Sequence, residues 1–274
     1  MYGLPYNLIK LIEAFLCFRS QKVKINNILS NQYPVLSGIP QGSVLGPLLF
    51  IIYVNDLAGV CDSLCNIFMF ADDAKMYKHI TNANDYQQLL ACCQELIRWS
   101  DLWCMKVNVN KCKVLSLTRN NIHKVIYDYD VNVNNKNVKL EQVEIMKDLG
   151  VNVDENLSFS DHIADKINKA YQIIEIINRT FEDIDKVPFF LLYKCMIRSH
   201  LEFAHSVWSP YKVGVIHDIE KVQKRATKLV RGCKKLSYQQ RLKYLKLPTM
   251  KYRRLRGDMI EVYKTLNDYH EDVC

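Results

Sequence analysis

Residues 66–80 read Asn-Ile-Phe-Met-Phe-Ala-Asp-Asp-Ala-Lys-Met-Tyr-Lys-His-Ile, two short apolar runs that are joined at Asp72-Asp73. This pattern predicts a β-hairpin with two acids at its turn. Adjacent carboxylates raise each other's pKa unless a cation neutralises them, and their oxygens suit Mg²⁺. A pair of such ions can stabilise both the attacking and the leaving oxygens in phosphoryl transfer. By themselves, however, two acids favour a solvated turn, because Asp is a common turn residue.

A loop that contains glycine precedes this predicted hairpin and changes its interpretation. Residues 37–50 read Ser-Gly-Ile-Pro-Gln-Gly-Ser-Val-Leu-Gly-Pro-Leu-Leu-Phe, and residues 53–57 read Tyr-Val-Asn-Asp-Leu. The glycines and the proline predict a loop over 37–42, and the apolar run after it predicts a helix over 43–57 that is packed on most sides. Glycine lets a backbone approach a nucleotide closely, and the N–H groups at a helix N-terminus favour phosphate.

The loop and Phe70-Ala71-Asp72-Asp73 together resemble the palm of reverse transcriptases from non-LTR retrotransposons of the jockey-like, LINE-related kind. The resemblance covers essentially the whole chain. It implies an RNA-directed DNA polymerase of a transposable element, a nucleotidyltransferase that uses Mg²⁺ or Mn²⁺. The implied partners are an RNA template, a DNA primer and deoxynucleoside triphosphates. An RNA-directed RNA polymerase or a group II intron maturase shares the Asp-Asp hairpin, but the amino-acid sequence of residues 46–50 and 53–57 argues against both.

The resemblance also implies roles for individual residues. The nucleotide and the template would be contacted by Ser37, Gly38, Pro40, Gln41 and Gly42. Asp72 matches the metal-ligand position and Asp73 its neighbour, so both are candidates for the catalytic metal site. Lys111 resembles the family lysine placed to assist pyrophosphate departure. Leu149 and Gly150 lie in a stretch that is similar to the hairpin that grips the primer terminus.

One part of the family pattern is absent from this sequence. In the family, an acidic motif of the form Phe-x-Asp-hydroxyl-Lys-Ala-Phe-Asp lies shortly before the helix that begins here at Tyr2, and it supplies the other main metal-binding aspartate. Asp56 and Glu13 are expected to be structural or surface residues rather than substitutes. We therefore expect an N-terminally truncated enzyme with an incomplete metal site, inactive by itself. The alternative is a catalytically dead remnant that acts at most as a basic nucleic-acid-binding module.

The predicted fold class is α+β, with a partial polymerase palm followed by an all-α region. Residues 1–155 are expected to form the palm, an antiparallel sheet with helices that includes the primer-grip-like hairpin. Residues 156–274 are expected to form a helical thumb and a basic C-terminal region. Helices are predicted over 4–18, from an N-cap at Asn84 to about 103, and over 160–181, 187–207 and 215–231, with a last pair between 238 and 266. Further strands are predicted over 22–25, 32–36, 113–117, 125–133 and 138–143.

Positive charge is concentrated near the C-terminus. The chain has a net charge of +8, and from Lys221 to Arg256 it has 14 Lys or Arg and no Asp or Glu. This distribution predicts a polyanion as partner. Spacings of three and four place one stripe along a helix face that fits a phosphate backbone, formed by Lys221, Lys224, Arg225, Lys228 and Arg231. The same stripe is equally typical of an ordinary solvated helix face.

The remaining features exclude several classes of protein. No apolar run approaches the roughly 18 residues needed to span a bilayer, and the first residues have no secretory signal. We therefore predict no membrane partner and an intracellular location, in the nucleus, the cytoplasm or both. The ten cysteines include no Cys-x-x-Cys pair that would suggest a zinc site, and they are predicted to be reduced, mostly buried thiols. Trp99 and Trp103 are predicted core residues, and nothing in the sequence indicates an oligomeric state.

Overall fold

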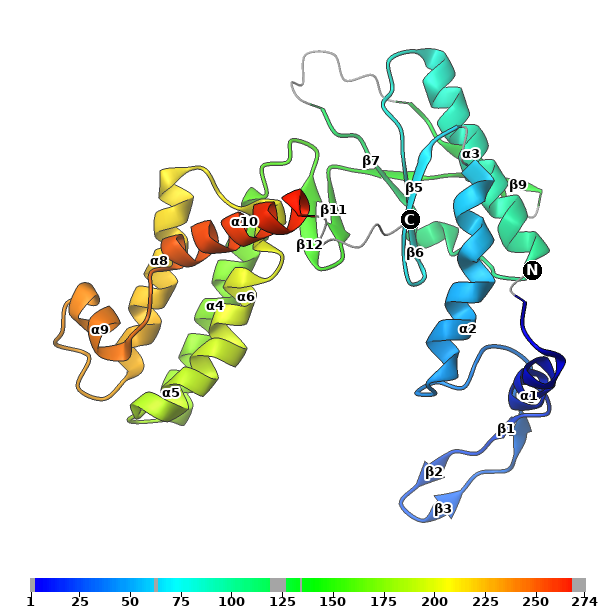
Figure 1. The fold of residues 1–274 in the computed structure, drawn as a ribbon. Helices are drawn as coiled ribbons and strands as arrows, with labels where there is room; N and C mark the ends of the chain where they lie inside the picture. Colours follow the sequence, from blue (N-terminus) through cyan, green and yellow to red (C-terminus); the bar gives the residue numbers. More distant parts are fainter. Residues whose placement is uncertain (1–2, 62–63, 119–126, 134, 268–274) are drawn as a thin grey trace. The chain divides into compact units, whose positions relative to one another are not determined.

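The structure is a computed structural model that describes residues 3–61, 64–118, 127–133 and 135–267. It combines helices with strands, which confirms a mixed fold class (Figure 1). The chain divides into two compact units, of which the first comprises residues 1–109 and 127–140 and the second residues 110–126 and 141–274. The finer assignment to palm and thumb, with its boundary at residue 155, stays a prediction.

The first unit begins with a helix and a paired ribbon, as predicted. The helix is α1 (Tyr6–Leu16). In the ribbon, β1 (Ser20–Gln21) pairs with β4 (Tyr33–Pro34), and β2 (Lys24–Ile25) pairs with β3 (Ile28–Leu29), all antiparallel. The inner turn falls at Asn26-Asn27, which suits asparagine because its short polar side chain tolerates a positive φ, here +46° at Asn26.

The apolar helix of the first unit, α2 (Leu45–Val54), continues into the 3₁₀ helix η1 (Asn55–Cys61). The expectation that it is packed on most sides is wrong within the described residues. Ile51, for example, is 58 % exposed. The reason is that the core of the unit reaches one side of the helix, where Val54 packs with Trp99.

The longest helix of the first unit, α3 (Ala83–Leu102), starts earlier than predicted. Its N-cap is Asn82, so the expectation of an N-cap at Asn84 is wrong. The Asn82 side chain accepts a hydrogen bond from the Asp85 N–H (3.1 Å), and the Asp85 carboxylate accepts one from the Asn82 N–H (3.2 Å). This reciprocal capping box satisfies two N–H groups that would otherwise lack a partner, and it fixes the start of the helix. At the other end, Trp103 is 38 % exposed and is not the core residue that was predicted.

Two antiparallel hairpins complete the first unit. The acid-bearing hairpin is formed by β5 (Asn66–Phe70) and β6 (Asp73–Tyr77). The second hairpin is formed by β8 (Asp130–Val133) and β9 (Lys136–Lys139), and β8 lies against α3. The beginning of the predicted strand 125–133 lies outside the described residues.

The second unit begins with two strand pairs. After the short 3₁₀ turn η2 (Val109–Lys111), β7 (Lys113–Leu115) pairs in parallel with β10 (Glu141–Val143). The hairpin of β11 (Ile145–Asp148) and β12 (Val151–Asp154) follows and is antiparallel. Within the described ranges the strands thus form separate pairs, one of them parallel, and the antiparallel palm sheet that was predicted is not continuous there.

Helices form the rest of the second unit. They are α4 (Ser160–Thr180), α5 (Lys186–Leu192), the π-helical segment η4 (Tyr193–Arg198), α6 (Ser199–Glu202), α7 (His205–Trp208), α8 (Val213–Ala226), the 3₁₀ turn η5 (Thr227–Leu229), α9 (Tyr238–Leu245) and α10 (Met250–Leu266). The predicted helices over 160–181 and 215–231 and the final pair are confirmed. The predicted helix over 187–207 is interrupted, because the backbone leaves the helical conformation at Phe203 and Ala204.

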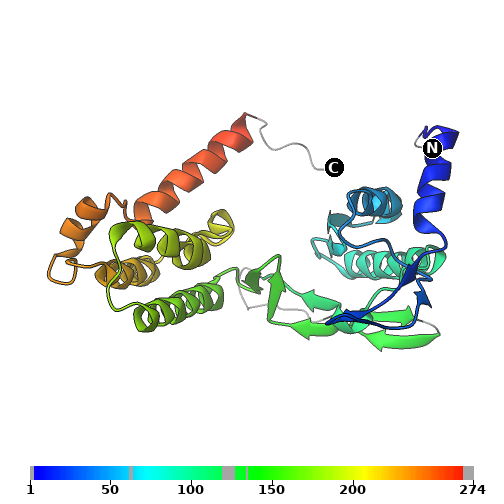
Figure 2. The same cartoon turned by 90° about the horizontal axis from the view of Figure 1, so that it is seen from below.

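The core of the second unit lies where α4, η4 and α8 meet. Ala170 and Ile174 of α4, Tyr193 of η4 and Val222 of α8 belong to one buried cluster that also includes Met250. In both views α10 runs as a single straight helix (Figures 1 and 2). Among the described residues, none of the helices combines the length and the apolar character needed to cross a membrane.

Candidate active site and nucleic-acid interface

The acid-bearing hairpin turns through two residues, Ala71 and Asp72, because Phe70 pairs directly with Asp73. Ala71 has a φ of +52°, a left-handed conformation that two-residue hairpin turns commonly need. Asp72 therefore lies at the tip of the hairpin, and Asp73 is the first residue of β6. Both acids are exposed, as a metal-binding role requires.

One face of this hairpin is packed and the other is open. Ile67 and Met69 pack against the core that contains Trp99. On the opposite face, the rings of Phe68 and Tyr77 are stacked, with centroids 5.4 Å apart and planes inclined by 2°. Within the part of the chain that is described, neither outer edge of the two-stranded sheet pairs with another strand. The core thus fixes the position of the hairpin while its tip and edges stay accessible.

The two acids fit a hard divalent cation in chemistry but not in number. Carboxylate oxygens are the ligands that Mg²⁺ and Mn²⁺ prefer. Within the described ranges, however, neither acid belongs to a group of three or more potential ligand side chains. The two acids considered as substitutes have other partners. Asp56 accepts a hydrogen bond from the Trp99 indole N–H (3.1 Å), and Glu13 accepts one from Lys10 (2.7 Å).

The loop over 37–42 precedes α2 and carries the predicted contacts to nucleotide and template. Of these residues, Ser37, Gly38, Gln41 and Gly42 are exposed and Pro40 is half-buried. Gly38 and Gly42 have φ values of +76° and +78°, and a Cβ on either would touch nothing within 4 Å. Glycine is therefore required at both positions by the backbone conformation, not by lack of space.

Arg19 holds this loop, a role that sequence reasoning missed. Its Nη2 donates a hydrogen bond to the carbonyl oxygen of Gly38, and its Nε donates one to that of Leu16 (2.7 Å). One guanidinium thus joins the end of α1 to the loop. Arg19 belongs to no motif, so the only signal for it is the fixed fork of donors that arginine can offer to two carbonyl groups.

The other end of the loop is joined to α2 by Ser43. The Ser43 hydroxyl donates a hydrogen bond to the Pro40 carbonyl (2.7 Å) and accepts one from the Gly46 N–H (3.1 Å). It therefore satisfies an N–H group in the first turn of α2 that has no partner within the helix. A Cβ on Gly46 would lie 2.9 Å from this hydroxyl oxygen, so glycine is required here by the close packing.

The predicted lysine and primer-grip residues lie in the second unit. Lys111 is exposed at the end of η2. Leu149 and Gly150 form the two-residue turn between β11 and β12, with φ values of +43° and +86°. The Lys166 ammonium donates a hydrogen bond to the Gly150 carbonyl (3.3 Å), and a Cβ on Gly150 would lie 3.1 Å from the Phe203 ring. The turn is therefore held from behind while Leu149 is exposed.

The predicted basic stripe lies on α8 and the residues after it, but part of its charge is paired. Lys221 forms an ion pair with Asp218 (2.8 Å), and Arg225 forms one with Glu175 of α4. Both acids lie outside the segment from Lys221 to Arg256, which itself has no Asp or Glu. The count of charges in that segment therefore overstates the net charge of the stripe.

The rest of the stripe keeps its positive charge. The Lys224 ammonium lies 5.4 Å from the ring centroid of Tyr238. Lys228 and Arg231 are exposed. Among the described residues, none of these three cations takes part in an ion pair of 4.0 Å or less. A phosphate backbone could therefore contact them without first displacing a carboxylate.

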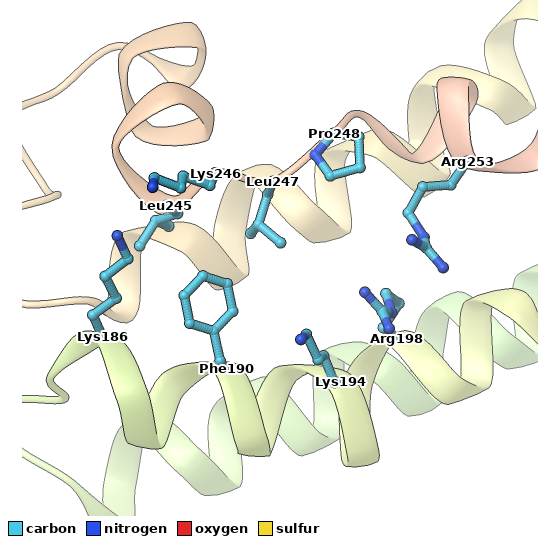
Figure 3. Close-up of a pocket in the computed structure, with 9 residues that line it drawn as sticks. All are labelled: Lys186, Phe190, Lys194, Arg198, Leu245, Lys246, Leu247, Pro248 and Arg253. Atoms are coloured by element: carbon cyan, nitrogen blue, oxygen red, sulfur yellow. The ribbon is translucent and has the colours of Figure 1, made fainter.

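A basic pocket of about 410 Å³ lies in the second unit between the α5–η4 helix and the connection from α9 to α10 (Figure 3). It is lined by Lys186, Phe190, Lys194, Arg198, Leu245, Lys246, Leu247, Pro248 and Arg253. Five of these are Lys or Arg. Arg198 and Arg253 point toward one another across it, and both contact Glu202, at 3.3 Å and 3.0 Å. Sequence reasoning missed the pocket, because its residues come from separate elements.

An exposed acid at the tip of an anchored hairpin, a glycine loop that runs into a helix, and basic surfaces are the parts of a template-dependent nucleic-acid polymerase. Comparison with known families agrees. The model of the family described as reverse transcriptase (RNA-dependent DNA polymerase) matches residues 3–153. This is more than half of the chain, which therefore belongs to the reverse transcriptase family.

The relatives that the chain matches are polymerases of mobile elements, and they confirm the jockey-like, non-LTR resemblance. The chain is 28 % identical over 242 residues to the RNA-directed DNA polymerase from mobile element jockey of Drosophila funebris, which covers 82 % of this chain and 25 % of that protein. It is 25 % identical over 242 residues to the Drosophila melanogaster protein named "Probable RNA-directed DNA polymerase from transposon X-element", covering 84 % of this chain and 25 % of that protein. The chain thus spans about a quarter of the length of these relatives. No solved structure matches it.

Proposed function

We propose that this chain provides the palm hairpin, the nucleotide-contacting loop and the helical region of an RNA-directed DNA polymerase from a non-LTR transposable element. The observation that carries the proposal is Asp72, exposed at the tip of a hairpin that the core anchors, in a chain of the reverse transcriptase family. Asp72, with Asp73 beside it, would hold Mg²⁺ or Mn²⁺. When bound, such an ion stabilises the charge that develops on the attacking and leaving oxygens.

The chain's own residues would position the reactants. The loop over 37–42 would contact the incoming deoxynucleotide and the template, with its shape set by Gly38, Gly42 and the clamp from Arg19. Lys111 would give a proton to the departing pyrophosphate. The Leu149-Gly150 turn would hold the end of the DNA primer. The exposure of Lys111 and Leu149 and the rigid backing of the turn by Lys166 support these roles.

Among the described residues no third carboxylate joins Asp72 and Asp73, so we propose that the chain alone is inactive. Two-metal transfer needs acids from more than one direction around the ions. Asp72 and Asp73 are adjacent at the tip of one hairpin, and no other described acid joins them. The open edges of the β5–β6 hairpin offer a place for a further strand that carries the partner carboxylate.

Primer extension tests both parts of this proposal. We expect no extension of a DNA primer on an RNA template by the isolated chain, with either Mg²⁺ or Mn²⁺. Extension by the chain that Asp72→Asn abolishes would refute the inactivity but support the site. Extension that Asp72→Asn leaves unchanged would refute the site itself. Asp56→Asn is the matched control, because Asp56 carries the same charge but is engaged by Trp99.

A second candidate function, nucleic-acid binding without catalysis, is favoured by the three cations of the stripe that have no acidic partner among the described residues and by the basic pocket. We expect the affinity for an RNA–DNA duplex to fall steeply with salt, since each neutralised phosphate contributes a slope of about 0.7–0.9 in log K against log salt. Lys224→Glu with Lys228→Glu should weaken binding and reduce this slope. Lys264→Glu on α10 is the control for a change of charge elsewhere. Unchanged binding in the double variant would exclude the stripe as the contact surface.

A further inference from the structure

Three cysteine side chains converge in the core of the first unit. Cys61 ends η1, Cys65 directly precedes β5, and Cys92 lies on α3. Their sulfur atoms all lie within 4.8 Å of one another, and all three residues are buried. The sulfurs of Cys65 and Cys92 are 2.7 Å apart. Neither a metal-binding nor a redox role has been assigned to these residues by the function proposed above.

We propose that Cys61, Cys65 and Cys92 form a binding site for one Zn²⁺ ion. Thiolate sulfur is a preferred zinc ligand, and the Cys-x-x-x-Cys spacing of the first two residues lies within the range found in structural zinc sites. Sulfurs at a Zn–S distance of about 2.3 Å in a tetrahedron lie about 3.8 Å apart. The cluster needs a separation of Cys65 from Cys92 by roughly 1 Å to reach this geometry. Cys65, 9 % exposed, marks the side where an exogenous fourth ligand could enter.

The charge around the cluster suits a metal thiolate. Three thiolates with one Zn²⁺ carry a net charge of −1, which is costly to bury without a nearby cation. A cation that contacts the chain next to the cluster is Lys78, whose ammonium donates a hydrogen bond to the carbonyl of Leu64, the residue before Cys65. Val60, Met76 and Leu89 pack around the three cysteines as apolar neighbours.

The alternative is that the three thiols are ordinary core side chains. Cysteine is among the most buried residues and packs like a small hydrophobic group. Burial raises the pKa of the Cys61 and Cys65 thiols, so without metal they stay protonated at neutral pH. The two possibilities therefore differ in whether added zinc releases protons, since a bound zinc ion would displace the thiol protons and thiols that only pack in the core would keep them.

Metal analysis of the full chain tests the proposal. The reduced protein, loaded with Zn²⁺ and dialysed, should retain one equivalent, and Co²⁺ in its place should give thiolate-to-metal charge-transfer absorption. Cys61→Ser, Cys65→Ser and Cys92→Ser should each lose both signals. Cys93→Ser, next to Cys92 but outside the cluster, and Cys104→Ser, exposed, should keep them. No stoichiometric binding by the wild-type chain, or loss of binding in the control variants, would overturn the site.

A second measurement needs no variant and so does not depend on how the substitutions fold. Zinc added to the wild-type chain in weak buffer should release about three protons per bound ion, as expected when three buried thiols become ligands. Binding without proton release would overturn the proposal. So would a disulfide between Cys65 and Cys92 in the protein purified without reductant, because it would leave one thiol for the metal.

Discussion

Replacing Gly46 by alanine should loosen the start of α2 by about 1–2 kcal/mol. The new Cβ would lie 2.9 Å from the Ser43 hydroxyl oxygen and 3.1 Å from the Ile39 Cδ1. The hydroxyl must then turn away and lose its hydrogen bonds to the Pro40 carbonyl and the Gly46 N–H, each worth roughly 1 kcal/mol. Displacement of Ile39 adds an overpacking cost of about 1 kcal/mol, and the helix preference of alanine returns about 1 kcal/mol.

Hydrogen exchange measured by mass spectrometry on peptides of α2 gives this free energy locally, which matters in a chain with two compact units. A loss of 1–2 kcal/mol corresponds to exchange that is faster by roughly 5–30-fold. Gly214→Ala on α8 is the matched control, because a Cβ at Gly214 would meet nothing within 4 Å. That variant should be unchanged or slightly more protected.

The reasoning depends on the Ser43 hydroxyl, and a double variant isolates it. In a Ser43→Ala background the oxygen is absent, so Gly46→Ala should cost at least 1 kcal/mol less than in the wild type. An equal cost in both backgrounds would show that the hydroxyl is not the group that requires glycine. If Gly214→Ala speeds hydrogen exchange as much as Gly46→Ala does, the effect comes from the alanine side chain in a helix and not from the contact with Ser43.

Three further predictions concern single side chains. Asp154→Ala should destabilise the second unit by about 1–2 kcal/mol in urea unfolding. The Asp154 carboxylate accepts hydrogen bonds from the N–H groups of Asn156 (3.1 Å), Ser158 (3.0 Å) and Phe159 (2.6 Å), and the variant loses all three. A loss of about 0.5 kcal/mol or less would contradict this prediction. Arg19→Lys should speed exchange in the loop over 37–42, because one ammonium cannot reach both carbonyls that Arg19 joins; equal protection would remove Arg19 as the clamp. Burial lowers the pKa of His162 from its ordinary 6.5, so the unfolded chain binds this proton more readily than the folded chain. The free energy of unfolding should therefore be full above pH 6.5 and fall below it by at most about 1.4 kcal/mol per pH unit. His162→Gln should remove this pH dependence.

The sequence predicts the acid-bearing hairpin well because its signal is local. Short apolar runs on both sides of the two acids predict β5, β6 and a turn between them, although the turn is Ala71-Asp72 and β6 runs from Asp73 to Tyr77. The start of α3 is also determined by neighbouring residues, since Asp85 lies three residues after Asn82, the spacing of a capping box. Choosing Asn84 overlooked that pair.

Features that depend on distant residues could not be predicted. The apolar sequence of α2 indicates burial, yet whether Ile51 is covered depends on which elements reach that side. Glu175 of α4 forms an ion pair with Arg225 of α8, and no local sequence pattern indicates that these two residues meet. Cys92 is far from Cys61 in the chain, so their convergence follows only from how α3 lies against η1.

The order in which the chain visits its two compact units affects how they can be separated. It passes from the first unit to the second after residue 109, returns for residues 127–140, and leaves again at residue 141. The backbone therefore crosses between the units at three junctions, and a single proteolytic cut at any one of them leaves part of one unit covalently attached to the other. Fragments that end at residue 109 would also lose the β8–β9 hairpin from the first unit. Expression of that unit alone therefore calls for residues 127–140 to be grafted back through a short artificial linker.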